Sequence, residues 1–316
     1  MKKKLKKIIG ITTLIILLLL CTGAVALSIF TGKQVAEGLI FFNKGNDTKA
    51  NSVNQLEEWG YDLALFENKY TSKALDIAAS DGTKIPAFLY SIEGSTDTVI
   101  LAHGFGGDHI SVAPIAQMYL ENDWNVISFD ARSAGDSTDE RTSFGYYEIQ
   151  DIHALAAYAK EELHSERIVV HGQSMGAAAT GLFASSKYAS QVDAVIMDSP
   201  FESMEKMFLG VWREMDGVED IPESYIIACG DWYLKHFYGF SFEDTNVLKK
   251  MKENGTKTLI ICSTQDNLIS VDKSAEMFDN IKSEEKEICY FDCPHIKGIY
   301  DYPAEYAEAV FSFLNE

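Results

Sequence analysis

Residues 167–181 read Arg-Ile-Val-Val-His-Gly-Gln-Ser-Met-Gly-Ala-Ala-Ala-Thr-Gly. A β-branched run passes through Gly172 into a Gly-x-Ser-x-Gly pentapeptide that ends at Gly176, and small residues on a helical pattern follow. This order is typical of a strand, a sharp turn and a helix, in which the flanking glycines allow close approach and the turn exposes the serine hydroxyl. We therefore predict that Ser174 is a nucleophile. The alternative is an ordinary glycine-rich turn between a strand and a helix.

The same alternation of strand and helix extends over most of the chain. Longer amphipathic stretches separate short β-branched runs, which predicts an α/β fold with a mostly parallel, doubly wound sheet covered on both faces. Residues 85–91 are expected to add an antiparallel edge strand. The runs lie at 98–103, 124–130, 167–171, 194–198, 258–263 and 287–291, and the amphipathic stretches lie at 111–121, 147–162, 174–188, 274–281 and 304–314.

The alternation stops between residues 201 and 251, where aromatic residues and methionines are frequent. We interpret this segment as a helical lid inserted into the domain, which covers the site and lines an apolar pocket. Part of its aromatic content is expected to form the lid's own small core.

The amino terminus has the pattern of a membrane or export signal. Five lysines precede residues 8–32, which carry no charge. Such a segment can cross a bilayer through residues 8–30, with the lysines in the cytoplasm and the remaining chain outside. Ala24-Val25-Ala26 also resembles a signal-peptidase site, so a secreted protein is the alternative. The expected organisation is a signal anchor at 1–32, an approach segment at 33–75 and a catalytic domain at 76–316.

Composition and charge exclude several classes of function. The chain has 316 residues and a net charge of −20, and without the five amino-terminal lysines 22 basic residues face 47 acidic ones. Nucleic-acid binding is therefore not expected, because it depends on clustered Lys and Arg. No phosphate-binding glycine motif or metal-ligand spacing is present, so neither a cofactor nor a metal is expected. The four cysteines beyond residue 32 could pair in three ways or remain buried thiols.

A nucleophilic serine requires a general base and an acid that orients the base. In a sheet of this kind, the chain order of the three residues is serine, acid and histidine. Only His236 and His295 follow Ser174 in the chain, and His236 lies in the expected lid. His295, after the last strand, is therefore the predicted base. Asp266, after the preceding strand, is the predicted acid, and Asp198, one strand earlier, is the alternative.

A glycine-rich loop, residues 103–107, follows an earlier strand at the place expected for an oxyanion hole. We predict that the backbone N–H groups of Phe105 and Met175 stabilise the oxyanion. His103, beside Gly104, is expected to orient this loop by hydrogen bonding and not to act as a base.

Together these motifs resemble the α/β-hydrolase superfamily, particularly bacterial membrane-anchored serine hydrolases of the serine-aminopeptidase-like branch. The resemblance covers residues 75–316 and includes 130–137, similar to the family's Asp-x-Arg-Gly-x-Gly-x-Ser loop, although Ser133 replaces the usual glycine. It implies cleavage of an ester, thioester or amide. We expect a carboxylic ester as substrate, with an aminopeptidase or amidase as the alternative, in which Glu202, Glu205 and Glu214 would bind an amine. A non-catalytic surface binding module is a remote alternative.

Overall fold

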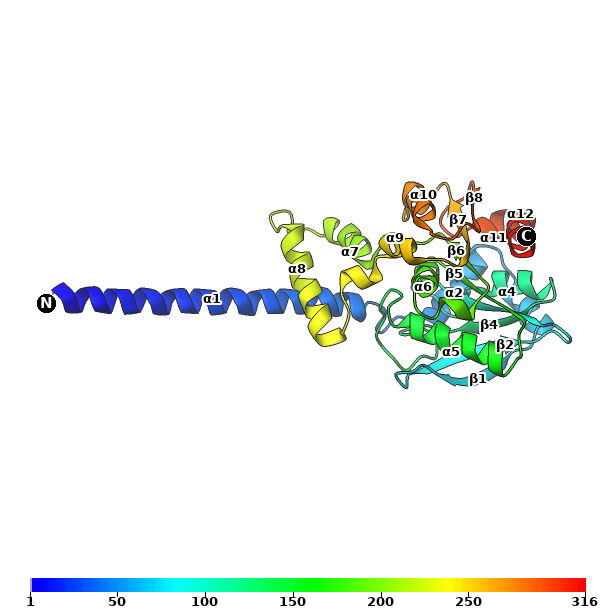
Figure 1. Ribbon diagram of the computed structural model, residues 1–316, viewed down its shortest axis with the longest axis horizontal. Helices are drawn as coiled ribbons and strands as arrows, with labels where there is room; N and C mark the ends of the chain where they lie inside the picture. Colours follow the sequence, from blue (N-terminus) through cyan, green and yellow to red (C-terminus); the bar gives the residue numbers. More distant parts are fainter. Residues whose placement is uncertain (1) are drawn as a thin grey trace.

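The computed structural model describes residues 2–316 and has an eight-stranded sheet at its centre (Figure 1). The strand order is β1-β2-β4-β3-β5-β6-β7-β8. Strands β3 to β8 are parallel to one another, whereas β2 pairs antiparallel with both β1 and β4. The strands are β1 (Lys73–Ala78), β2 (Lys84–Tyr90), β3 (Asp97–Ala102), β4 (Asn125–Phe129), β5 (Arg167–Gln173), β6 (Ala194–Asp198), β7 (Lys257–Ser263) and β8 (Lys286–Phe291).

Helices cover both faces of this sheet, as predicted. Successive side chains of a strand point to opposite faces, so Val99 and Leu101 of β3 pack with one group of helices, and Ile100 packs with the other. The first face carries α4 (Ala113–Leu120), α11 (Gly298–Asp301) and α12 (Pro303–Asn315), and the second carries α5 (Glu148–Glu161) and α6 (Met175–Ala184). Helix α10 (Val271–Asn280) packs beside β7 and β8.

The expected edge strand is an inner strand. Residues 84–90 form β2, which lies between β1 and β4, and the edge is β1 at Lys73–Ala78. Its alternating burial leaves most of its side chains at least partly exposed. The sequence pattern therefore carries only a weak strand signal there, because a strand that is largely exposed has no continuous apolar run.

The amino-terminal segment is a single helix, α1 (Lys2–Ile40), which projects away from the sheet (Figure 1). Its first part is exposed, whereas Gly32, Val35, Ala36, Leu39 and Ile40 are buried in the body of the protein. The predicted boundary at residue 32 therefore falls inside the helix. The rest of the approach segment contains α2 (Thr48–Glu58) and α3 (Leu63–Lys69), and its last residues belong to β1.

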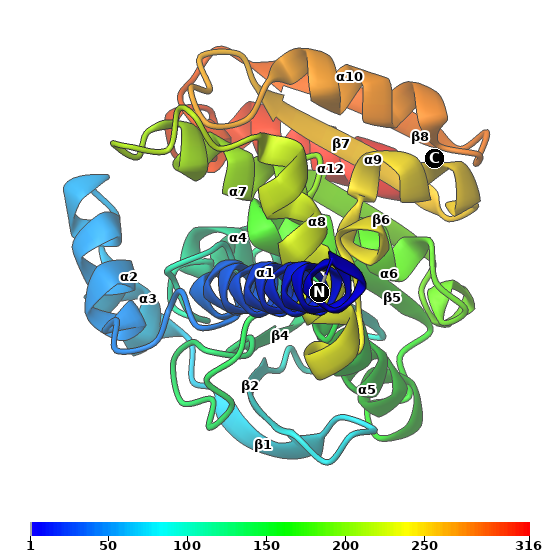
Figure 2. The ribbon, with the colours of Figure 1, turned by 90° about the vertical axis from the view of Figure 1, so that its left-hand side faces the viewer.

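The expected lid lies between β6 and β7 and is largely helical. Its main helices are α7 (Met204–Arg213), α8 (Glu223–Tyr233) and the short α9 (Val247–Lys250), with a π-helical turn at Leu234–Tyr238. Helix α8 packs against α1, and both views place α8 beside it (Figures 1 and 2). The lid and α1 thus form one unit at the end of the molecule where α1 emerges.

Candidate active site

Ser174 occupies a strained turn between β5 and α6. Its φ of 55° and ψ of −112° are unfavourable for a residue with a side chain, so the surrounding structure must hold them. A Cβ atom at Gly172 would lie 2.1 Å from the carbonyl oxygen of Gly176, and one at Gly176 would lie 2.0 Å from that of Ala102. Both glycines are therefore required for the close packing of α6 on β5 and β3.

Ser174, His295 and Asp266 form a continuous row of hydrogen bonds. Nε2 of His295 lies 2.9 Å from Oγ of Ser174, and Nδ1 lies 2.5 Å from Oδ2 of Asp266. A carboxylate only accepts hydrogen bonds, so Nδ1 carries the proton and Nε2 is free to accept the proton of the Ser174 hydroxyl. The arrangement matches that required for activation of a serine.

Asp266 is held as an ionised acceptor. Burial by itself would raise the pKa of this carboxyl, but the hydrogen bond from His295 and those from the amides of Leu268 and Ile269 outweigh it and lower the pKa below its usual range. The two amides bind Oδ1 at 2.8 Å each, which leaves Oδ2 for His295. Asp266 is therefore fixed in the orientation that the histidine needs.

Asp198, the alternative acid, makes other contacts. Its oxygens accept hydrogen bonds from Gln173, Ser199 and Tyr306 at 3.2, 3.0 and 3.0 Å, and no hydrogen bond joins it to His295. Burial raises the pKa of this carboxyl. His236 lies on the lid with its Nδ1 bonded to the carbonyl of Trp232, away from this row.

The loop after β3 lies against the turn that carries Ser174. A Cβ atom at Gly104 would lie 3.4 Å from Cβ of Ser174. The N–H of Phe105 makes no hydrogen bond within residues 2–316, and Met175 begins α6, so its N–H has no acceptor inside the helix. The two N–H groups predicted for the oxyanion hole are thus free of protein acceptors in the described chain.

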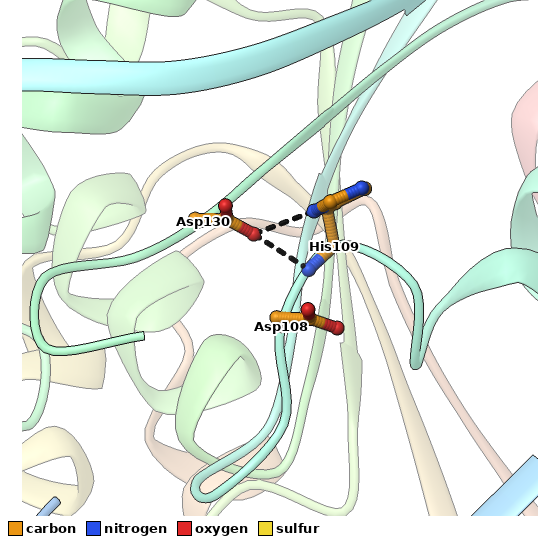
Figure 3. A group of neighbouring side chains, drawn as sticks. All are labelled: Asp108, His109 and Asp130. Atoms are coloured by element: carbon orange, nitrogen blue, oxygen red, sulfur yellow. Dashed lines mark hydrogen bonds and ion pairs between the residues drawn. The ribbon is translucent and has the colours of Figure 1, made fainter. Parts of the chain in front are cut away.

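Histidines at both ends of this loop connect it to the loop after β4. Nε2 of His103 accepts a hydrogen bond from the N–H of Ala131 at 3.0 Å, which leaves Nδ1 to donate to the carbonyl of Gly104 at 2.7 Å. Burial lowers the pKa of His103, consistent with a neutral ring. At the other end, Oδ1 of Asp130 accepts hydrogen bonds from the backbone N–H and from Nδ1 of His109 (Figure 3).

Within residues 2–316, one group of side chains has ligand atoms close enough together to hold a metal ion. It consists of Asp108, His109 and Asp130 (Figure 3). Nδ1 of His109 is only 2.6 Å from Oδ1 of Asp130, a direct hydrogen bond with no room for an ion between the two atoms. The other oxygen of Asp130 accepts the N–H of Asp136. These hydrogen bonds indicate that the group connects the loop after β3 to the loop after β4 and does not bind a metal ion.

The approach segment supports the same loops, a role that sequence reasoning missed. Oγ of Ser52 on α2 accepts the N–H of Asp108, and Nδ2 of Asn51 donates to the carbonyl of Gly106. Thr48 accepts the N–H of Gly135 in the next loop. Helix α2 therefore braces the glycine-rich loop from outside the sheet.

Ser174 and His295 open into a cavity of about 630 Å³ with mainly apolar walls. The lid contributes one wall through α7, as predicted, and α1 contributes another through Val35, Gly38 and Leu39. Within residues 2–316, no Asp, Glu, Lys or Arg lines the cavity. The role of α1 was not predicted, although Val35, Ala36, Leu39 and Ile40 have the spacing of one helical face.

Comparisons with known proteins agree with this architecture. A family model described as "alpha/beta hydrolase fold" matches residues 97–220. An esterase of Pyrococcus furiosus, Pf2001, is 23% identical with a TM-score of 0.63, covering 81% of this chain and 96% of the esterase. The esterase EaEST of Exiguobacterium antarcticum is 18% identical with a TM-score of 0.55, covering 77% of this chain and all of EaEST. The uncharacterized protein YqkD of Bacillus subtilis is 23% identical over 83% of this chain and 85% of YqkD. The chain therefore has the α/β-hydrolase fold.

Proposed function

We propose that this protein is a serine hydrolase that cleaves carboxylic esters, with Ser174 as nucleophile, His295 as general base and Asp266 as the acid that orients it. The observation that carries the proposal is the row of hydrogen bonds from Asp266 through His295 to Ser174, at the mouth of an apolar cavity. The similarity to two esterases supports an activity of this class.

In the proposed reaction, Oγ of Ser174 attacks the ester carbonyl while Nε2 of His295 takes its proton. The N–H groups of Phe105 and Met175 stabilise the negative oxygen that develops. His295 then gives the proton to the leaving alcohol, and an acyl group remains on Ser174. Water, activated by the same histidine, hydrolyses this acyl-enzyme and releases the carboxylic acid.

An ester suits the cavity better than the free amine of an aminopeptidase substrate. Glu202, Glu205 and Glu214 do not line the cavity. A buried ammonium group without a carboxylate partner would be strongly unfavourable. The aminopeptidase alternative therefore has no carboxylate among the cavity-lining residues of the described chain to pair with its amine. A binding module would have no need for the hydrogen-bonded row.

We further propose that residues 8–30 of α1 anchor the protein in the membrane with the catalytic domain outside the cytoplasm. The exposed helix is long and apolar enough to cross a bilayer, and lysines precede it. Cleavage after Ala26 would instead release the protein. The intact masses of the protein recovered from the membrane fraction and from the surrounding medium distinguish the two outcomes.

The direct test of the reaction is labelling by a fluorophosphonate, which reacts with activated serines. Full-length protein in detergent is treated with the probe, and its intact mass is compared with that of Ser174→Ala. We expect one adduct on the wild type and none on the variant, together with hydrolysis of a short-chain ester by the wild type alone. A folded wild-type protein that takes no adduct and hydrolyses no ester would contradict the proposal.

A further inference from the structure

The cavity begins where the proposed membrane span ends. Gln34, which lines the cavity, comes four residues after Phe30 at the end of the span. At a rise of about 1.5 Å per residue, these two residues are only about 6 Å apart along the helix axis. In a bilayer, the cavity that contains Ser174 would therefore lie directly against the outer membrane surface.

The lid reaches the same level because it packs tightly on α1. A Cβ atom at Gly32 would lie 2.3 Å from the carbonyl oxygen of Cys229, and one at Gly230 would lie 2.5 Å from Cγ1 of Val35. Glycines thus bring α1 and α8 into close contact, as small residues do between membrane helices. In addition, the hydroxyl of Tyr225 is 3.1 Å from Oγ of Ser28, a residue inside the proposed span.

Exposed apolar side chains are concentrated at this end of the molecule. In the described chain after α1, all the large exposed apolar residues except Leu65 and Tyr290 either belong to the lid or line the cavity. Figure 2 views this end along α1, with α7 and α8 beside the helix. A concentration of this kind marks an interaction surface. The residues are Val211, Met215, Ile221, Tyr225, Trp232 and Phe237 on the lid, and Phe42, Phe105 and Leu268 around the cavity.

Charged residues limit the depth of this surface in a bilayer. The connection between α7 and α8 carries Glu214, Asp216, Glu219 and Asp220 among its apolar residues. Carboxylates are costly in the hydrocarbon core but remain hydrated among lipid headgroups, where Tyr and Trp are also favoured. The mixture of carboxylates and aromatic side chains on the lid is therefore compatible with a position among the lipid headgroups and not in the hydrocarbon core.

We propose that the lid lies on the outer surface of the bilayer and that the substrate is an ester lipid of that leaflet, whose acyl chain enters the cavity directly from the bilayer past α1 and α7. This inference rests on the proposed ester hydrolysis at Ser174. The cavity has no charged lining residue, so it suits the acyl chain of the lipid and not a charged headgroup. Hydrolysis consumes one water molecule and yields a fatty acid and the alcohol of the lipid.

The physical advantage of this route is that the acyl chain never crosses water. Its transfer from the bilayer to an apolar cavity exchanges one apolar environment for another, so little of the hydrophobic free energy that holds the chain in the membrane is lost. Only the ester group has to leave the headgroup region to reach Ser174.

The test compares two substrates of the full-length protein in vesicles of a neutral phospholipid. One is a fluorogenic long-chain acyl ester lipid built into the vesicles, and the other is a water-soluble short-chain ester of the same fluorophore. The lid variants are Ile221→Glu and Phe237→Glu, whose side chains are 38% and 60% exposed and do not line the cavity. The matched controls are Tyr290→Glu and Leu65→Glu, 49% and 65% exposed and remote from the lid.

We expect each lid variant to hydrolyse the vesicle ester about tenfold more slowly, because the change replaces an apolar side chain that contacts the bilayer with a hydrated carboxylate. Hydrolysis of the soluble ester should change by less than about twofold, and the control variants should resemble the wild type on both substrates. Equal losses on both substrates would overturn the inference, because the lid would then act through the cavity and not through the membrane.

Two further outcomes separate this inference from the proposed function. If the wild type hydrolyses the soluble ester but not the vesicle ester, the inference is overturned and the proposed function stands. The inference is also overturned if the lid variants hydrolyse the vesicle ester at the wild-type rate. Loss of a dimer in detergent would in that case assign the lid surface to contact with a second copy of the chain. If neither ester is hydrolysed and Ser174 takes no fluorophosphonate, the proposed function itself fails.

Discussion

The two sides of the cavity are built differently. On one side, Ser174, Asp266 and His295 follow the carboxyl ends of β5, β7 and β8, and the buried sheet fixes their positions. On the other side, α1 and the lid provide apolar walls that contact each other more than they contact the sheet. Under the proposed function, the sheet side performs the chemistry and the lid side selects what reaches it.

The largest effect on the sheet side is expected from removal of the proposed general base, His295. We expect His295→Ala to lower kcat/KM for a short-chain ester by at least about a thousandfold, because Ser174 would lose its proton acceptor. His236→Ala is the matched control, since it removes the other histidine after Ser174 and lies on the lid. A loss of similar size in His236→Ala would assign the base to the lid side.

A second change separates the two candidate acids of the sheet side. Asp266→Asn should lower kcat by about a thousandfold or more, because an amide no longer fixes the His295 tautomer that accepts the serine proton. Asp198→Asn preserves the shape of a carboxyl that binds Gln173, Ser199 and Tyr306, and should cost less than about tenfold. Both values come from steady-state ester hydrolysis. The reverse order would make Asp198 the acid.

On the lid side, the contact between α1 and α8 can be broken at a glycine. Leucine at Gly32 would collide with the Cys229 carbonyl, so we expect Gly32→Leu to displace the lid and to reduce hydrolysis of a long-chain ester by about tenfold. Gly23→Leu is the matched control on the same helix, because nothing lies within 4 Å of its Cβ position. Protease sensitivity of the lid, measured in parallel, should rise only in Gly32→Leu. Unchanged activity and protease resistance would contradict the contact.

The smallest expected effect concerns stability on the sheet side. Burial lowers the pKa of His171 to about 3, whereas a histidine in the unfolded chain titrates near 6.5. As the pH falls below about 6.5, the unfolded state binds a proton that the folded state does not, so the free energy of unfolding decreases by up to about 1.4 kcal/mol per pH unit.

His171→Gln should remove this contribution and flatten the dependence of the free energy of unfolding on pH between about 7 and 5. Chemical unfolding of the full-length protein in detergent, followed by circular dichroism, measures it. His236→Gln, at a histidine on the lid, is the control and should keep the wild-type slope. An unchanged slope in His171→Gln would mean that this buried histidine does not oppose folding at low pH.

The difference between the two sides also explains what the sequence could predict. Strands β3 to β7 of the parallel sheet are almost continuous buried runs, and β8 keeps a short apolar run although only Phe291 is buried. The turn at Ser174 carries a compact local pattern, so the fold and the positions of Ser174, Asp266 and His295 after their strands follow from short stretches read in order. The edge strand β1 was not predicted, because its side chains are mostly exposed and leave no continuous apolar run in the sequence. The predicted boundary at residue 75 falls inside β1, and the one at residue 32 falls inside α1.

The walls of the cavity could not be derived in this way. Val35 and Gly38 line the same cavity as Ser174 only because α1 continues past the apolar segment and packs on a lid almost 200 residues later in the chain. A hydropathy pattern shows where an apolar segment lies but not where its helix ends or what it contacts. Gly32 and Gly230 are the sequence features that indicate close packing of α1 on α8. They can be interpreted only once the contact between these distant parts of the chain is known.

Helix α1 runs without a break from Lys2 to Ile40, and this continuity has a mechanical consequence. A domain on a flexible linker explores a volume that grows with the length of the linker. A domain on a rigid rod keeps one height and presents one face to the bilayer. Its search for substrate would then be two-dimensional, and its turnover would follow the surface density of lipid esters and their lateral diffusion instead of their concentration in the surrounding fluid.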